Sequence, residues 1–118
     1  MSLAGCRSSG FLTADTAVFV GQCKLISIHG VNVGANSSGT PAFNPITLNL
    51  YDHATAASGD IVAKIQLSPT SDVGAVGYLG TSIEFDMHGV ICSKGLYVDF
   101  GNGPGGAAGI PMCTIEFA

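Results

Sequence analysis

The chain has 118 residues, of which 47% are apolar and only 10% are charged, and its formal net charge is −4. This length predicts one domain, while ordinary soluble domains carry about 25% charged residues. The four basic residues are scattered, so nucleic-acid binding is not expected. Glycine, proline and polar residues interrupt the long uncharged stretch 25–51, so no membrane span is expected either. The low charge predicts instead that other protein covers part of the surface.

Residues 1–15 lack a sustained hydrophobic period and are rich in small residues. They are predicted to be an N-terminal arm before a domain that spans 16–118. The arm is either a frayed tail or a segment that docks on a neighbouring subunit. Phe11 and Leu12 favour docking, because a disordered tail has little use for large apolar side chains, and both are candidate partner contacts.

Residues 16–21 (TAVFVG) and 22–33 (QCKLISIHGVNV) are predicted strands, with Gly21 at a bulge or turn between them. In the second strand the apolar residues fall on both parities, with Leu25, Val31 and Val33 on one and Ile26 and Ile28 on the other. This pattern predicts a central strand with two apolar faces, or a strand in an interface. His29 is interpreted as a hydrogen-bonded core or interface histidine rather than a ligand.

The loop 34–45 (GANSSGTPAFNP) holds Phe43 between two prolines, and this residue is a candidate anchor for a partner. Two alternating segments follow, 46–52 and 61–67, joined by the polar connection 53–60. A period of two around a glycine-bearing connection predicts a strand, a loop and a strand. The predicted inward face comprises Ile46, Leu48 and Leu50 in the first strand and Ile61, Ala63, Ile65 and Leu67 in the second.

The next loop, 68–80, contains Tyr78, a further candidate partner contact. Residues 81–87 alternate again, and 89–93 are predicted to be a turn or a short strand. In this segment Ile83, Phe85 and Met87 are predicted to point inward, and Glu84, Asp86 and His88 outward.

The last strands are predicted at 94–100 and 110–117, separated by the glycine-rich loop 101–109. Pro111 is expected to place the start of the final strand at a sheet edge. The predicted inward residues are Leu96, Val98 and Phe100 in one strand and Cys113, Ile115 and Phe117 in the other. Seven or so short strands without a helix signal predict an all-β fold, a single β-sandwich of jelly-roll-like or immunoglobulin-like connectivity.

Two groups of residues are candidates for chemistry. Glu84, Asp86 and His88 could form an acid pair or a metal patch, although a solvated polar face explains them more simply. Asp52 and His53, with Asp60 across the connection, could form a calcium or sugar site, although turn-forming acids are the simpler interpretation. No catalytic residue, cofactor or metal site is therefore predicted, and the chain is not expected to be an enzyme.

The four cysteines are Cys6, Cys23, Cys92 and Cys113, and they lack zinc-finger or redox-motif spacing. Three disulfide connectivities are possible, and the sequence does not select one. Reduced thiols in a cytosolic assembly are the preferred interpretation, because buried free cysteines behave as small apolar residues.

From Ala17 to Phe117 the chain resembles small virion proteins of tailed bacteriophages. The segments that carry the resemblance are GQCKL (21–25), TLNLYD (47–52) and GVICSKGLYV (89–98). The resemblance implies a β-sandwich structural subunit, such as a head decoration (cement) protein or a tail or fibre component, and brings no catalytic residues.

The expected function is therefore capsid decoration. The protein would act as a homotrimer that binds the major capsid protein on the outside of the head, after assembly in the host cytoplasm. The alternative is a carbohydrate-binding β-sandwich module on a tail or fibre, although the chain has no tryptophan for an aromatic platform.

Overall fold

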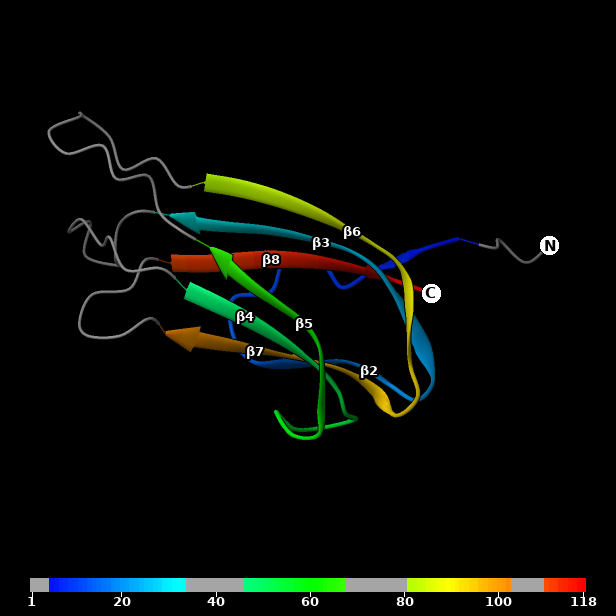
Figure 1. Ribbon diagram of the computed structural model, residues 1–118. Helices are drawn as coiled ribbons and strands as arrows, with labels where there is room; N and C mark the ends of the chain where they lie inside the picture. The colour runs from blue at the N-terminus through cyan, green and yellow to red at the C-terminus, as the bar shows by residue number, and fades with distance from the viewer. Residues whose placement is uncertain (1–4, 34–45, 68–80, 103–109) are drawn as a thin grey trace, which may run out of the picture.

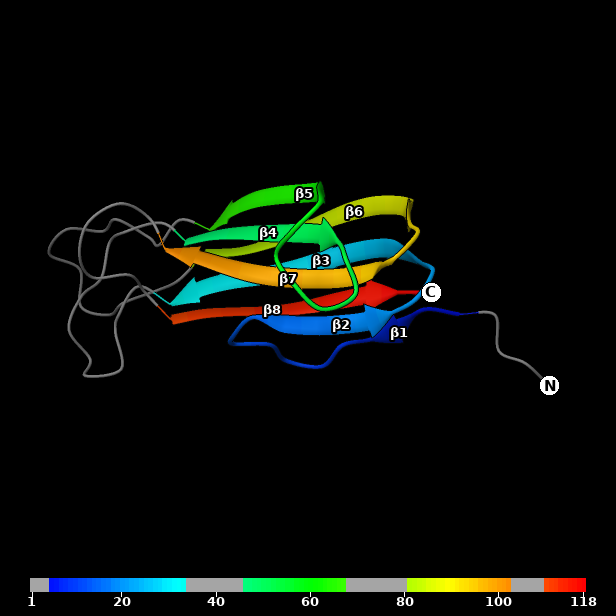
Figure 2. The ribbon, with the colours of Figure 1, turned by 90° about the horizontal axis from the view of Figure 1, so that it is seen from below.

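The computed structural model describes residues 5–33, 46–67, 81–102 and 110–118, and all regular structure in these ranges is β-strand. The strands are β1 (Arg7–Ser8), β2 (Thr16–Val20), β3 (Cys23–Val33), β4 (Ile46–Asp52), β5 (Asp60–Leu67), β6 (Thr81–Cys92), β7 (Gly95–Asn102) and β8 (Ile110–Phe117). They form two packed four-stranded antiparallel sheets, ordered β1-β8-β3-β6 and β2-β7-β4-β5 (Figures 1 and 2). The prediction of an all-β sandwich is confirmed. No helix in the described part of the chain is long and apolar enough to cross a membrane.

The strand pairing is that of a long antiparallel ribbon rolled up on itself. In the ribbon β1 pairs with β8, β2 with β7, β3 with β6, and β4 with β5. Rolling adds the pairs β3–β8 and β4–β7, which complete the two sheets. Successive strands therefore alternate between the sheets except at the β4–β5 hairpin. This is jelly-roll connectivity, so the pairing decides between the two topologies that the sequence left open.

The core lies between the sheets and follows from the two-residue period of the strands. Its fully buried side chains are Leu25, Ile28, Leu48, Leu50, Leu67, Cys92, Leu96, Val98, Cys113 and Ile115. Of the residues predicted to point inward in 94–100 and 110–117, five are buried, namely Leu96, Val98, Cys113, Ile115 and Phe117, and these predictions are confirmed. Phe100 is partly buried and packs against the same core.

A bulge in β3 corrects the prediction that Leu25 and Ile28 lie on opposite faces. The register with both neighbouring strands shifts between Leu25 and Ser27. Because the extra residue reverses the parity of the strand, Leu25 and Ile28 both lie in the core, while His29 is directed to the outer face. The bulge therefore places Leu25 and Ile28 on the same inner face, while Val31 lies on the outer face with His29.

Two other irregularities also change predicted positions. The register shift after Leu50 pairs Tyr51 with Ile61, which leaves Ile61 50% exposed instead of inward. In β6, His88 and Gly89 have positive φ angles of 54° and 77°, opposite the bulge of β3. These left-handed residues absorb the irregularity, so β6 continues to Cys92 instead of ending before a separate turn.

As a whole β8 is a central strand, because it lies between β1 and β3. However, β1 pairs only with Phe117 and Glu116, so the strand beside β8 does not reach Pro111. On its other side Pro111 pairs with Asn32 of β3. The proline therefore occupies the part of β8 where a missing N–H costs no pairing with β1.

The N-terminal segment predicted as an arm contributes β1 and then follows β8 of the same chain. The amide of Ser9 donates to the carbonyl of Ile115 at 2.8 Å, and Leu12 forms an isolated bridge with Cys113. Further on, the Phe100 amide donates to Asp15 Oδ1 at 2.8 Å. These bonds join residues 9–15 to both sheets.

The connections 34–45, 68–80 and 103–109 begin and end at the same end of the sandwich (Figures 1 and 2). The registers require this, because they pair the strand ends that flank the connections: Val33 with Ile110, Asn32 with Thr81, and Ile46 with both Leu67 and Asn102. Phe43 and Tyr78 fall on these connections and lie outside the described residues. The C-terminus lies at the opposite end, beside the short connections (Figure 1).

Candidate functional site

Asp52, one of the residues considered for a calcium or sugar site, is bonded to the β6–β7 turn. Its Oδ2 accepts hydrogen bonds from the Ser93 amide at 2.9 Å and the Ser93 hydroxyl at 3.0 Å. Its Oδ1 accepts from the amides of Lys94 at 2.7 Å and Gly95 at 3.3 Å. Both carboxylate oxygens of Asp52 therefore accept hydrogen bonds, and these bonds hold the β6–β7 turn against the end of β4.

The imidazole ring of His53 is hydrogen-bonded within its own loop. Its Nδ1 accepts hydrogen bonds from the amides of Thr55 at 3.1 Å and Ala56 at 3.0 Å. Asp60 is the register partner of Asp52, but its side chain is exposed. The structure therefore gives Asp52 and His53 roles in local structure, as the simpler interpretation of the sequence proposed.

The outer face of the β1-β8-β3-β6 sheet carries a polar cluster centred on His29. The Nε2 atom of His29 lies 3.0 Å from Glu116 Oε1 and 3.3 Å from Ser27 Oγ, and its Nδ1 lies 3.6 Å from Glu84 Oε2. His29 is thus hydrogen-bonded, as predicted, but it lies half-buried on the outer face and not in the core. Alternation along 110–117 placed Glu116 on an outward face, but no local signal showed that β8 lies beside β3, so sequence reasoning missed this partner.

Glu84 and Asp86 are exposed on this face, and His88 Nδ1 lies 3.6 Å from Asp86 Oδ2. Within the described ranges, no group of three or more His, Cys, Asp or Glu side chains is arranged to hold a metal ion. Their spacing in the sequence suggested that Glu84, Asp86 and His88 form one group. In the structure Glu84 lies beside His29, and His88 lies at the irregularity opposite the bulge of β3.

Beside this cluster lies a shallow hollow of about 110 Å³. It is lined by Phe11, His29, Gly30, Val31, Met112, Cys113 and Thr114. Phe11 is 82% exposed at its margin, whereas Leu12 packs against the core of its own chain. Of the two apolar residues predicted as contacts in the arm, Phe11 is therefore the one presented to solvent.

Other large apolar side chains are exposed as well. In the described part of the chain they are Val20, Ile61, Phe85 and Ile91, in addition to Phe11. Phe85 points toward the inner side of its sheet, but β6 is an edge strand, so its ring is 41% exposed. The described surface thus carries several exposed large apolar side chains from both sheets and from the segment before β2.

A second polar group lies on the outer face of the other sheet. Asn49 and Asp99 are register partners, and Asn49 Nδ2 donates to Asp99 Oδ2 at 3.4 Å. Asn49 Oδ1 is buried and has no hydrogen-bond partner among the described residues. Burial, followed by the negative charge and hydrogen bond of Asp15, raises the pKa of Asp99 above its ordinary value, although the Asn49 hydrogen bond opposes this shift.

Asp99→Asn is expected to stabilise the protein at neutral pH. A raised folded-state pKa means that the fold disfavours the ionised form, so stability is lost as the pH rises through that pKa. Removing the charge should therefore raise the melting temperature at pH 7, and the gain should vanish below about pH 4, where the carboxyl is protonated. Asp60→Asn is the matched control, because it removes an equal charge from an exposed position. An equal gain from both variants would show that only net charge matters.

No protein-family model, curated protein or solved structure matches this chain. Support for a function therefore comes from the fold, the surface chemistry and the sequence itself.

Proposed function

We propose that the chain is a bacteriophage virion structural protein, a decoration or cement protein that binds the outer surface of the head and stabilises it. The observation that carries the proposal is a jelly-roll sandwich with few charges, in which five large apolar side chains are exposed among the described residues. Exposed apolar side chains gain free energy when another protein removes them from water. The resemblance of segments 21–25, 47–52 and 89–98 to virion proteins supports the same assignment.

The position of the long connections adds to this support. Connections 34–45, 68–80 and 103–109 leave the sandwich at one end and contain a single charged residue, Asp72. An end with so little charge loses little solvation energy when another protein covers it. The two sheets would act as a rigid frame that presents this end and the face bearing Phe11.

The proposed partner is the major capsid protein, and the proposed assembly is a homotrimer. A stable contact needs about 1,200–2,000 Å² of buried surface. A trimer presents each contact three times, and a symmetric capsid repeats its binding site, so weak individual contacts gain strength through multivalency. The protein would reside on the capsid surface after assembly in the host cytoplasm.

Heads that lack this protein are expected to rupture at a lower temperature or force than complete heads. The measurement compares thermal or mechanical rupture of purified heads before and after addition of the wild-type protein. Unchanged rupture would remove the stabilising role. The copy number, measured by densitometry of purified particles, separates the two virion roles, since hundreds of copies indicate the head and a handful indicate the tail or a fibre.

Variants of exposed apolar residues test which part of the surface binds the heads. Phe11→Ser is expected to lower the affinity for heads about tenfold, the loss typical of an aromatic contact residue. Ile61→Ser is the matched control, because Ile61 is also exposed but belongs to an edge strand of the other sheet. Equal binding by both variants and the wild type would exclude Phe11 from the contact.

The carbohydrate-binding alternative receives less support. The residues considered for a sugar site included Asp52 and His53, and their acceptor atoms bond to amides of nearby turns. A glycan array probes this alternative directly, and specific binding would favour a tail or fibre module over a head protein.

A further inference from the structure

Two of the four cysteines face each other across adjacent strands. Cys23 of β3 and Cys92 of β6 are direct register partners, and both are buried in the core. Their thiols are within hydrogen-bonding contact. Directly opposed residues in an antiparallel pair have Cα atoms about 4.5–5.5 Å apart, within the range of about 4.4–6.8 Å that a disulfide requires.

The other two cysteines cannot replace either member of this pair. Cys113 is the register partner of Gly30, which lies about 20 Å along β3 from Cys23 at the usual rise per residue. Cys6 is exposed and precedes β1, which is separated from β3 by β8. Of the three connectivities open from sequence, the register therefore supports a bond only between Cys23 and Cys92.

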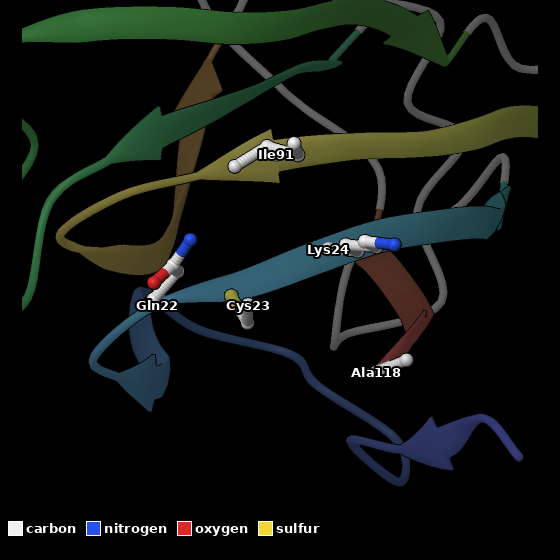
Figure 3. Close-up of a pocket in the computed structure, with 5 residues that line it drawn as sticks. All are labelled: Gln22, Cys23, Lys24, Ile91 and Ala118. Carbon is white, nitrogen blue, oxygen red and sulfur yellow. The ribbon is translucent and has the colours of Figure 1, made fainter. Parts of the chain in front are cut away.

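A small molecule can approach the pair from one side. A surface hollow of about 350 Å³ is lined by Gln22, Cys23, Lys24, Ile91 and Ala118 (Figure 3). Cys23 is 4% exposed, whereas Cys92 has no exposed surface. The Cys23 sulfur is therefore the one that meets an external reagent first.

We propose that Cys23 and Cys92 form a reversible intramolecular disulfide when a low-molecular-weight disulfide, such as oxidised glutathione, supplies the oxidising equivalent. The Cys23 thiol loses its proton, and its sulfur attacks one sulfur of oxidised glutathione, which releases one glutathione thiolate and leaves a mixed disulfide. Deprotonated Cys92 then attacks the Cys23 sulfur, forms the internal bond and releases the second glutathione. Two protein thiols are oxidised and one external disulfide is reduced to two thiols.

Burial makes this exchange slow at neutral pH, because the thiolate is the reacting species. Desolvation raises the pKa of both thiols, that of Cys92 to about 12, and the negative charge of Asp52 adds to the effect on each. The rate is therefore expected to increase as the pH rises from 7 to 9. The inference concerns the fold alone and does not depend on the proposed function.

The bond would join the central strand β3 to the edge strand β6 close to the β6–β7 turn. Because it closes a long loop of the chain, it should raise the melting temperature by roughly 10 °C, and a reducing agent should reverse the rise. Oxidation would thus change the stability of the sandwich without a change in its topology.

The test uses the full chain with Cys6→Ser, which removes the exposed thiol and leaves the core unchanged. The folded protein is incubated with oxidised glutathione at pH 8.5, and its mass and cysteine-containing peptides are measured. The expected product has lost two hydrogen atoms and contains a Cys23–Cys92 peptide link. A link to Cys113, or no link while Cys6 of the wild-type chain becomes glutathionylated, would overturn the proposal.

The order of attack is tested by removing Cys92. In a Cys6→Ser, Cys92→Ala chain, the mixed disulfide with glutathione should remain on Cys23, because no thiol resolves it. In the matched Cys6→Ser, Cys23→Ala chain, Cys92 should stay unmodified. An adduct on Cys92 in the second chain, with none on Cys23 in the first, would reverse the proposed order and contradict the role of the hollow.

Discussion

Gly95→Ala is expected to lower the free energy of unfolding by about 3 kcal/mol or more, near the upper range for overpacked sites. A Cβ atom at this position would lie 2.7 Å from the carbonyl oxygen of Phe19 and 2.9 Å from both the carbonyl oxygen of His53 and the Cα of Ala54. These are backbone atoms of β2 and of the β4–β5 connection, so they cannot give way by changing a rotamer. Urea denaturation of the purified variant measures the loss.

Gly101→Ala is the matched control on the same strand. There a Cβ atom would meet its nearest neighbours at 3.5 Å, which is ordinary van der Waals contact. The expected change in the free energy of unfolding is within about 1 kcal/mol. If both alanine variants unfold at the same urea concentration, the close approach of three backbone segments at Gly95 is not the constraint.

Asp52→Ala has the second largest expected effect, a loss of about 2–3 kcal/mol in the free energy of unfolding, because hydrogen bonds to a charged group are the stronger kind. The change removes the acceptor for three amides and one hydroxyl of residues 93–95. Asp52→Asn keeps one carbonyl oxygen and should lose less. Chemical denaturation measures both variants, and Asp60→Ala, which truncates an exposed carboxylate, is the control.

The pH dependence of the Asp52 contribution has a definite sign. The hydrogen bond from the Lys94 amide, followed by those from Ser93 and Gly95, lowers the pKa of Asp52 below its ordinary value of 3.8, although burial opposes the shift. A lowered pKa gives stability that is complete above the ordinary value and is lost as the pH falls through the folded-state value. The difference between wild type and Asp52→Ala should therefore shrink below pH 3.8. A difference that stays constant to pH 2 would contradict a role for the charge.

Both variants affect the same junction, since Gly95 donates its amide to Asp52 and packs against the segment that follows it. The sequence contains the residues of this junction but not its geometry. Asp52 and Gly95 are far apart in the chain, and only the β4–β7 pairing brings them together. Turn chemistry indicated an acidic residue at the end of a strand, which is a local signal. Its partners are non-local, so no pattern within the hairpin identified them.

The same distinction applies to the predicted surface residues. Alternation predicted that Glu84 and Asp86 face outward, because side-chain direction follows directly from the strand period. That His29 would bind Glu116 depends on β8 lying beside β3, and this pairing results from rolling the whole ribbon. Phe11 and Leu12 looked equivalent in sequence, yet the bridge between Leu12 and Cys113 directs one to the core and leaves the other exposed.

Local patterns were enough to predict the all-β class, the approximate strands and most inward residues, because alternation and turn preferences act over a few neighbouring residues. The jelly-roll connectivity, the effect of the bulges and the pairing of Cys23 with Cys92 follow only from the folded arrangement of the strands. Each depends on register, and a register shift of one residue reverses which side chains face the core. Register is set by the simultaneous fit of several strands, so it is not contained in any one of them.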